Sequence, residues 1–295
     1  MTRRALVVTH GGREEAVTAT AEAVRELEAA GFETLRDGEH GTDPAHLVDV
    51  EIAVVLGGDG TILRAAEITR GTPIPLLGVN LGHVGFLAES ERDDIGEAVR
   101  RIAARDYEVE ERGTLEVRAM LPGEVEPILT SWALNEATVE KADRDRMIEV
   151  VIEVDGRPLS SFGCDGVVMA TSTGSTAYAF SAGGPVVWPD VDGMILVPVS
   201  AHALFARPLV VGPRSVLAVE VLTRSTSAGV VSCDGRRRFD LPPGARVEVR
   251  RSGVPVRLAR LGRAPFADRL VSKFSLPVEG WRGRAPAGPA RTGTP

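Results

Sequence analysis

The sequence predicts an α/β domain built on a parallel sheet, followed by an all-β, sandwich-like domain. Three observations lead to this fold class. Strand and helix patterns alternate over roughly the first hundred residues. Strand and turn patterns fill the chain from residue 113 to 258, and the longest apolar runs, such as Ile52 to Leu56, have the length of strands. A chain of 295 residues can bury a core in each of two such domains.

The N-terminal part is predicted to alternate between strands and helices. We expect strands at residues 5–8, 32–35, 50–56 and 75–79, and helices at 13–30, 62–69 and 93–104. The first helix carries apolar residues near helical spacing at Ala16, Val17, Val24 and Leu27, and Gly31 is expected to end it. The third strand is nearly all apolar, which is typical of a parallel strand buried on both faces.

The pattern changes to strands and turns near residue 111. Residues 150–154 and 157–162 flank Asp155-Gly156 as in a β-hairpin, and further strands are expected at 216–222 and 246–251, with Gly253 as a break. We therefore divide the chain into an α/β domain (1–112), a β-rich domain (113–258), a segment that returns to the first domain (259–279) and a disordered tail (280–295).

Composition and charge exclude several classes of protein. The net charge of −7 argues against a nucleic-acid surface, which needs a positive footprint. No apolar run reaches the roughly 18 residues of a membrane span. The apolar segment after Arg3-Arg4 stops at Thr9, so it is interpreted as a strand and not as a secretion signal, and we expect a cytoplasmic protein. Two cysteines, Cys164 and Cys233, do not make a disulfide framework or a zinc site.

Rare residue types draw attention to particular positions. The chain has two Lys, two Asn (Asn80 and Asn135) and no Gln, while Arg and Ala are abundant, which indicates a GC-rich bacterial genome. Residue types that are avoided elsewhere are expected where chemistry requires them.

A glycine loop follows the buried strand at 50–56. It reads Gly57-Gly58-Asp59-Gly60-Thr61 and leads into a helix. In open α/β sheets ligands bind at the carboxyl ends of strands, and glycine N–H groups with a helix N-terminus suit phosphate. Asp59 would repel phosphate unless it had another task, such as accepting a proton or holding a metal, and the alternative is a turn in which Asp59 caps the helix. The loop matches neither a P-loop nor a dinucleotide fingerprint.

Two further segments carry polar groups suited to a nucleotide. Asn135-Glu136 pairs an amide with a carboxylate, which can bind a ribose or a base or can close a strand edge. Asp165-Gly166 leads through an apolar strand to residues 171–178, where six of eight residues bear a hydroxyl group. Such a stretch suits phosphate and sugar binding.

Together these segments resemble the bacterial NAD kinase family. The matching motifs are Gly57 to Gly60, Asn135-Glu136, Asp165-Gly166 and Thr171 to Tyr178, in that order. Further matches lie at 78–87, 181–185, 207–209 and 232–235, so the resemblance covers about residues 5 to 276. Ser172 stands where the family often has Pro. The glycine loop alone is shared with lipid kinases and phosphofructokinases, whereas the combined set is specific.

The resemblance implies an activity and a set of ligands. It implies ATP-dependent phosphorylation of the 2′-hydroxyl of the adenosine ribose of NAD, with a divalent cation (Mg²⁺), polyphosphate as a further donor in some members, and a homodimer or homotetramer. The implied base is Asp59, and the implied phosphate contacts are Gly57, Gly58, Gly60 and Arg64. The implied NAD contacts are Asp59, Gly60, Asn135, Glu136, Arg146, Asp165, Thr173, Thr176, Ala177, Tyr178, Ala179, Phe180, Ser181 and Arg236.

Several alternatives stay open from the sequence. Arg64, Arg146 and Arg236 are equally well interpreted as solvated surface charges, and Asn80 and His83 as structural residues of a glycine-rich turn. Two other functions share the glycine loop or the binding residues. A lipid kinase of the diacylglycerol or sphingosine type would keep the loop but would not need Asn135-Glu136, and a sensor would bind NAD without turnover.

Overall fold

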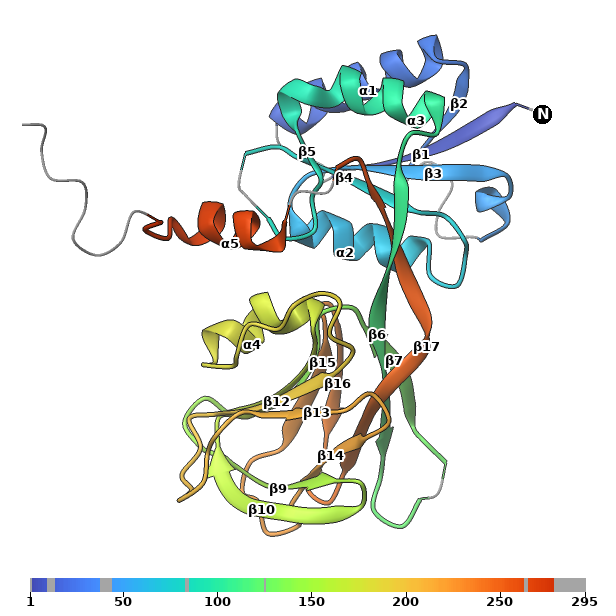
Figure 1. Cartoon of the computed structure of the whole chain (residues 1–295). Coiled ribbons are helices and arrows are strands. Elements are labelled where there is room, and N and C mark those ends of the chain that lie inside the picture. Colours follow the sequence, from blue (N-terminus) through green and yellow to red (C-terminus); the bar gives the residue numbers. More distant parts are fainter. Residues whose placement is uncertain are drawn as a thin grey trace, which may run out of the picture.

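The computed structural model of the chain describes residues 2–9, 14–37, 44–82, 85–124, 126–262 and 265–278. The predictions for His83 and for the tail at 280–295 lie outside these residues. Figure 1 shows an α/β part and a β-rich part joined by two long strands, with a short helix beside the junction. In the part that is described, no helix is long and apolar enough to cross a membrane.

The α/β part has a parallel sheet with helices on both faces. Its central strands are β1 (Arg3–Thr9), β2 (Phe32–Arg36), β3 (Val50–Leu56) and β4 (Leu76–Asn80), in the order β4-β3-β1-β2, with the short β5 (Ser90–Glu91) beside β4. Helices α1 (Glu14–Ala29) and α3 (Ile95–Ala104) pack against one face, and α2 (Asp59–Ile68) packs against the other. Single turns of 3₁₀ helix lie at Pro44–Leu47 and Arg92–Asp94.

Alternation along β3 explains why the strand is apolar throughout. Ile52 and Val54 lie in the core with α1 and α3, whereas Ala53 and Val55 lie in the core with α2. Both faces of the strand are therefore buried, as predicted. Gly31 ends α1 with a φ of 87°, also as predicted.

One helix position was predicted wrongly. Val17 of α1 is 65% exposed, and the buried face of the helix is made mainly by small residues: Ala16, Ala19, Thr20, Ala23, Val24 and Leu27. Alanines bring a helix close to a sheet, and their weak apolar signal hides the true face from a periodicity argument.

The β-rich part is a sandwich of two antiparallel layers. One layer is a six-stranded sheet in the order β13-β12-β11-β8-β15-β16. Its strands are β8 (Glu136–Lys141), β11 (Gly166–Thr171), β12 (Met194–Val199), β13 (Leu209–Val211), β15 (Gly229–Cys233) and β16 (Arg237–Leu241). The other layer contains β6 (Glu108–Met120), β7 (Leu129–Ala133), β9 (Ile148–Val154), β10 (Arg157–Cys164), β14 (Val216–Val221) and β17 (Arg246–Arg260). Side chains from both layers form one buried cluster, which confirms the predicted fold class.

Two strands, β6 and β17, run through both parts. They pair antiparallel on both sides of an irregularity between Ser252 and Val256, and Leu258 of β17 also pairs in parallel with Leu76 of β4. Gly253 therefore does not end the strand, as the sequence suggested, but lies in this irregularity. The predicted boundaries at 112/113 and 258/259 both fall inside these continuous strands.

Helix α5 (Phe266–Phe274) lies between the two parts. Its Phe274 ring stacks on Phe180 of the β-rich part, with centroids 4.7 Å apart, and lies 5.9 Å from Phe86 of the α/β part. The helix buries no residue completely. The segment that was predicted to return to the first domain thus contacts both.

Candidate active site

The glycine loop lies at the carboxyl edge of the parallel sheet, between β3 and the start of α2. Gly57 has a φ of 149°, and a Cβ atom on it would lie 2.4 Å from Oγ1 of Thr61, so only glycine fits there. The Gly57 N–H donates to the carbonyl of Val79 on β4, at 2.9 Å. A pocket of about 260 Å³ lies against the loop, bounded also by Glu15 at the start of α1 and by Asn80.

Asp59 is the first residue of α2, and its carboxylate is held in a fixed place. The backbone N–H groups of Phe86 and Leu87 each donate to it at 3.2 Å. Gly85 allows this approach, because a Cβ atom there would lie 2.4 Å from Oδ1 of Asp59. The side chain is half-buried, so one side of an immobilised acceptor remains accessible.

Two polar residues near the loop are engaged by other protein groups. Arg64, one turn along α2 from Gly60, pairs with Asp37 at 2.7 Å. Asn80, at the end of β4, donates to the carboxylate of Glu91 at 2.9 Å and accepts the N–H of Gly82 at 3.3 Å. This agrees with the structural role that was expected for Asn80.

Asn135 and Glu136 stand where β8 begins, and their backbone is fixed by Asp234. The Asp234 carboxylate accepts the N–H groups of Leu134 (2.9 Å), Asn135 (2.7 Å) and Glu136 (3.3 Å). Leu134 also belongs to the buried cluster that contains Ile62 of α2 and Leu87. The Asn135-Glu136 segment therefore packs next to the helix that Asp59 begins.

Glu136 carries a carboxyl group in an unusual setting. Burial, together with the charge of Asp234, raises its pKa to about 8, against an ordinary value of 4.5. Its Oε2 atom is buried and, among the described residues, has no hydrogen-bond partner. The backbone N–H of Tyr178 donates to the same carboxyl group. Glu136 is thus a neutral acid at pH 7 with an unused polar atom.

The hydroxyl-rich loop packs directly on Asn135. A Cβ atom on Gly174 would lie 2.0 Å from the Asn135 carbonyl oxygen, and the Thr171 N–H donates to that oxygen at 2.9 Å. Ser175 is fully buried, and its hydroxyl both donates to and accepts from the backbone of Val187. Part of the hydroxyl content therefore builds the loop itself.

The hydroxyl groups of Thr173, Thr176 and Tyr178 contact other protein groups. Thr173 is buried with its Oγ1 3.5 Å from a guanidinium nitrogen of Arg112, and the Thr176 hydroxyl donates to the Thr173 carbonyl. The Tyr178 hydroxyl donates to Glu140 at 3.0 Å, and burial together with this carboxylate raises the pKa of Tyr178 to about 12.

The residues that follow Thr176 form the short helix α4 (Tyr178–Ser181). Ala177 is half-buried, Ala179 is fully buried, and Ser181 is exposed. Phe180 is 39% exposed and stacks on Phe274 of α5. Phe180 thus connects the hydroxyl-rich loop to the helix beside the junction.

Three predicted charged residues lie at different places. Asp165 pairs with Lys141 at 2.6 Å, and this lysine holds the pKa of the Asp165 carboxyl below its ordinary value. Arg236 pairs with Glu67 of α2 at 2.9 Å, and so lies at the junction of the two parts. Arg146 lies in the β8–β9 loop, paired with Asp143 at 3.9 Å.

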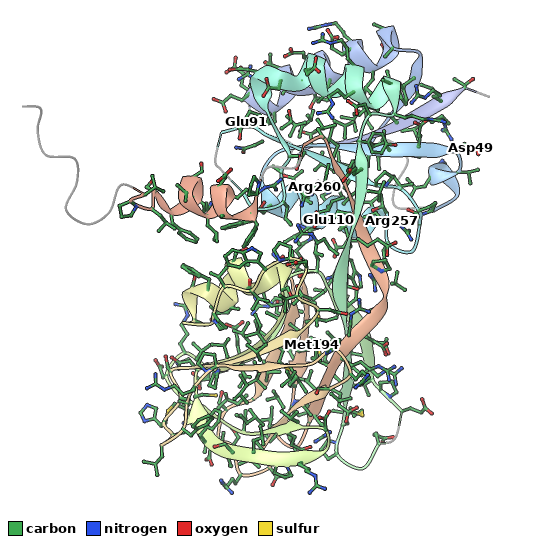
Figure 2. All side chains as sticks on the ribbon, viewed as in Figure 1. Asp49, Glu91, Glu110, Met194, Arg257 and Arg260 are labelled. Carbon is green, nitrogen blue, oxygen red and sulfur yellow. The ribbon has the colours of Figure 1, made fainter. Side chains whose placement is uncertain are left out.

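A second pocket, of about 570 Å³, opens at the junction beside the hydroxyl-rich loop. Its walls include Phe86, Arg112, Trp188, Arg260, Phe266 and Arg269. Figure 2 shows Arg260 and Glu110 here, where β6 and β17 pass from one part to the other; they pair at 2.6 Å. Among the described residues, no group of three or more His, Cys, Asp or Glu side chains is arranged to hold a metal ion.

Asp234 is the main residue that sequence reasoning left out of the site. The signal was present, because Cys233-Asp234-Gly235 repeats the Cys164-Asp165-Gly166 pattern. Only the first copy was assigned to the site. In the structure Asp234 has a φ of 52° and a buried carboxylate with three backbone N–H donors.

The sequence of the chain matches known proteins over nearly its whole length. A family model described as the ATP-NAD kinase N-terminal domain matches residues 5–107, and one described as the ATP-NAD kinase C-terminal domain matches residues 134–261. The NAD kinase of Leifsonia xyli subsp. xyli is 62% identical over 297 residues, covering 95% of this chain and 97% of that protein. The NAD kinase of Thermobifida fusca is 55% identical over 303 residues, covering 96% and 92%. These actinobacterial relatives agree with the GC-rich bacterial origin inferred from composition.

Solved structures share the same fold. An NAD kinase from Archaeoglobus fulgidus in complex with ATP superposes with a TM-score of 0.73 at 28% identity, covering 92% of this chain and 98% of that chain. Yeast NADH kinase complexed with NADH superposes with a TM-score of 0.83 at 20% identity, covering 92% and 87%, which shows likeness of fold. On its sequence, both family models and its fold, the chain belongs to the NAD kinase family, the enzymes that use ATP to phosphorylate NAD.

Proposed function

We propose that Asp59 is the general base that accepts the proton of the ribose 2′-hydroxyl as NAD attacks the terminal phosphoryl group of ATP. The observation that supports this role most is the fixed carboxylate of Asp59 at the glycine loop, held by two backbone N–H groups beside the Asn135-Glu136 segment. A carboxylate is a weak base, so Asp59 would orient the hydroxyl and take the proton late, as in protein kinases.

The remaining predicted residues divide into donor and acceptor contacts. Gly57, Gly58 and Gly60 bind phosphate through backbone N–H groups, since their loop borders a pocket at a helix N-terminus. Arg64 would have to exchange Asp37 for phosphate. The acceptor contacts are Asn135, Glu136, Asp165, Thr173, the residues 176–181 and Arg236. Arg146, whose guanidinium pairs with Asp143 of its own loop, also belongs to the proposed set.

Glu136 is suited to bind a ribose hydroxyl. A neutral carboxyl group donates one hydrogen bond and accepts others, and its unpartnered Oε2 would otherwise stay buried at a cost. An NAD hydroxyl supplies the missing partner. This assigns Glu136 to binding and leaves proton transfer to Asp59.

A divalent cation fits the site only together with ATP. Mg²⁺ is commonly held by one or two carboxylates plus substrate phosphates, and not by an all-protein cage. The described residues offer no such cage, and Asp59 is the carboxylate of the glycine loop. Asp59 would therefore hold the ion jointly with the phosphates, and the ion would neutralise their charge.

We further propose that the enzyme acts in the cytoplasm as a homodimer or homotetramer. Exposed apolar side chains support self-association: Leu204 is fully exposed, and Phe205 and Val210 are more than half exposed, around β13 of the sandwich. Light scattering on the purified protein tests the oligomer.

One assay with two proteins tests the function. Purified protein is given ATP, Mg²⁺ and NAD, and NADP is measured with a dehydrogenase specific for NADP. We expect Asp59→Asn to lower kcat at least about a hundredfold, because removal of a general base typically costs 10²–10⁴, while the Kd of NAD changes little. Turnover near that of the parent would remove the general-base role from Asp59.

The same assay separates the alternatives. Product from diacylglycerol or sphingosine alone would indicate a lipid kinase, and tight NAD binding without product would indicate a sensor. Replacing ATP with polyphosphate tests the second donor.

A further inference from the structure

Arg237 connects the two parts of the molecule more directly than any residue assigned above. It begins β16, and its guanidinium NH1 donates to Glu67 of α2 at 2.5 Å. Its NH2 donates to Asp234 at 3.0 Å and to the Trp132 carbonyl at 2.8 Å. One side chain thus bridges a carboxylate of the α/β part and a carboxylate of the sandwich.

An aromatic ring reinforces this bridge. The guanidinium carbon of Arg237 lies 4.5 Å from the centroid of the Trp132 ring, and that of Arg70, just after α2, lies 4.2 Å from it. Arg70 is further held by Thr114, Ser252 and the Val254 carbonyl, on β6 and β17. Trp132 is therefore contacted by one guanidinium from each part, and Arg237 has little freedom to move.

Each end of the bridge leads to a proposed site residue. Glu67 lies eight positions after Asp59 on α2, which is about 12 Å along a helix. Asp234 holds the backbone N–H groups of Leu134, Asn135 and Glu136. Arg237 thus connects the helix that carries the proposed base to the segment proposed to hold the acceptor.

We propose that Arg237 is a positioning residue for phosphoryl transfer, which sets the distance between Asp59 and the NAD ribose by bridging Glu67 and Asp234. This inference rests on the proposed role of Asp59. Arginine suits the task because its planar fork donates in two directions at once, which a lysine ammonium cannot reproduce with the same geometry. A small displacement at this bridge matters, since misplacement of reacting groups by about 1 Å can cost a hundredfold in rate.

Three variants test the bridge in the NADP assay: Glu67→Ala, Arg237→Lys and the double variant. We expect Glu67→Ala to lower kcat about tenfold, because it removes the α/β end of the bridge while Asp234 keeps its bonds to residues 134–136. The same change releases Arg236, a proposed acceptor contact, so the Kd of NAD should also rise. Arg237→Lys should lower kcat similarly and also weaken NAD binding. The double variant should be no slower than Arg237→Lys, since both changes break the same contact between Arg237 and Glu67.

A matched control separates positioning from folding. Glu97→Ala removes a glutamate of α3 that pairs with Arg100 on the same helix. Because α3 packs on the sheet face opposite α2, this variant should keep kcat and Kd. All rates are divided by the folded fraction from circular dichroism. A purely structural role would change the melting temperature and leave kcat per folded molecule unchanged.

Different outcomes would refute the base role of Asp59 and the positioning role of Arg237. Full turnover by Asp59→Asn would refute the base and with it the distance that Arg237 is proposed to set; the bridge variants decide the inference when Asp59→Asn is slow. The inference is overturned by kcat values within about twofold of the parent in both single variants, or by fully additive losses in the double variant. Hydrogen exchange gives a readout without turnover: Arg237→Lys should speed exchange of the Leu134, Asn135 and Glu136 amides, and unchanged rates would also overturn the inference.

Discussion

Glu136 and Asp234 are two buried carboxyl groups with opposite surroundings. Asp234 receives three backbone N–H donors and the Arg237 guanidinium, which favour its ionised form, although burial raises its pKa from the ordinary value. Glu136 receives one backbone donor and faces the Asp234 charge, so its pKa rises to about 8. The two neighbouring acids thus differ in role: Asp234 fixes the backbone, whereas Glu136 has the pKa that is raised to about 8.

The raised pKa of Glu136 predicts how stability depends on pH. Between its ordinary value of 4.5 and about 8, the unfolded chain loses this proton while the folded protein keeps it. The unfolded state then binds fewer protons, so this group lowers stability as pH rises through that window. We expect Glu136→Gln, which cannot ionise, to raise the melting temperature relative to the parent by more at pH 8 than at pH 5.

Thermal unfolding of both proteins at several pH values checks this prediction. The difference in melting temperature should grow steadily with pH in that range and then level off above about pH 8. A difference that stays constant across the range would mean that the carboxyl group of Glu136 ionises normally.

Local motifs predicted the candidate site residues but not the contacts that hold these residues in place. Asn135, Glu136 and Thr173 were predicted as site residues from local motifs. The Asp234 carboxylate binds amides about a hundred positions earlier in the chain, and the Arg237–Glu67 pair spans 170 positions. Such pairs depend on how the two parts meet, which no local pattern encodes.

At the scale of elements, the hydroxyl-rich loop and the start of β8 are built against each other. Gly174 allows the loop to lie on the Asn135 carbonyl, and Thr171 donates to the Leu134 carbonyl at 2.6 Å. Because the two segments share these contacts, a shift of one segment must move the other. A change in one segment should therefore be felt by ligands of the other.

Gly174→Ala tests this close packing. The added methyl group would lie 2.0 Å from the Asn135 oxygen, so the loop must move, and overpacking of this kind costs about 1–3 kcal/mol or more. We expect a lower melting temperature together with weaker NAD binding by calorimetry. Gly212→Ala is the control, since its methyl group would meet nothing within 4 Å. Equal behaviour of the two variants would contradict the packing argument.

On the scale of the whole molecule, the α/β and sandwich parts share one sheet. Sequence patterns predicted the four central strands of the α/β part but fewer than half of the strands of the sandwich, and they divided the chain at residues that lie inside β6 and β17. The reason is physical: each of these strands changes its environment along its length while its backbone pairing continues. Hydrophobic patterns depend on the surroundings of the side chains, so they indicate a domain boundary inside β6 and β17 although the backbone pairing of these strands continues there.

Shared strands predict cooperative unfolding. Separating the two parts would break the pairing of β6 with β17 and the contacts of Trp132 with Arg70 and Arg237. We expect one calorimetric transition, with the van't Hoff enthalpy close to the measured enthalpy for the folding unit. Two resolved transitions would show that the parts unfold independently.

The pairing of β6 with β17 also places the two ends of the sandwich next to each other. Arg112, where the chain enters the sandwich, lies opposite Val256, where it leaves. A domain whose first and last residues are adjacent can be inserted into another domain without disrupting it, because it replaces a single loop. The sandwich can thus be regarded as an insertion into the α/β domain, with the pocket at the junction lying on the boundary between the two.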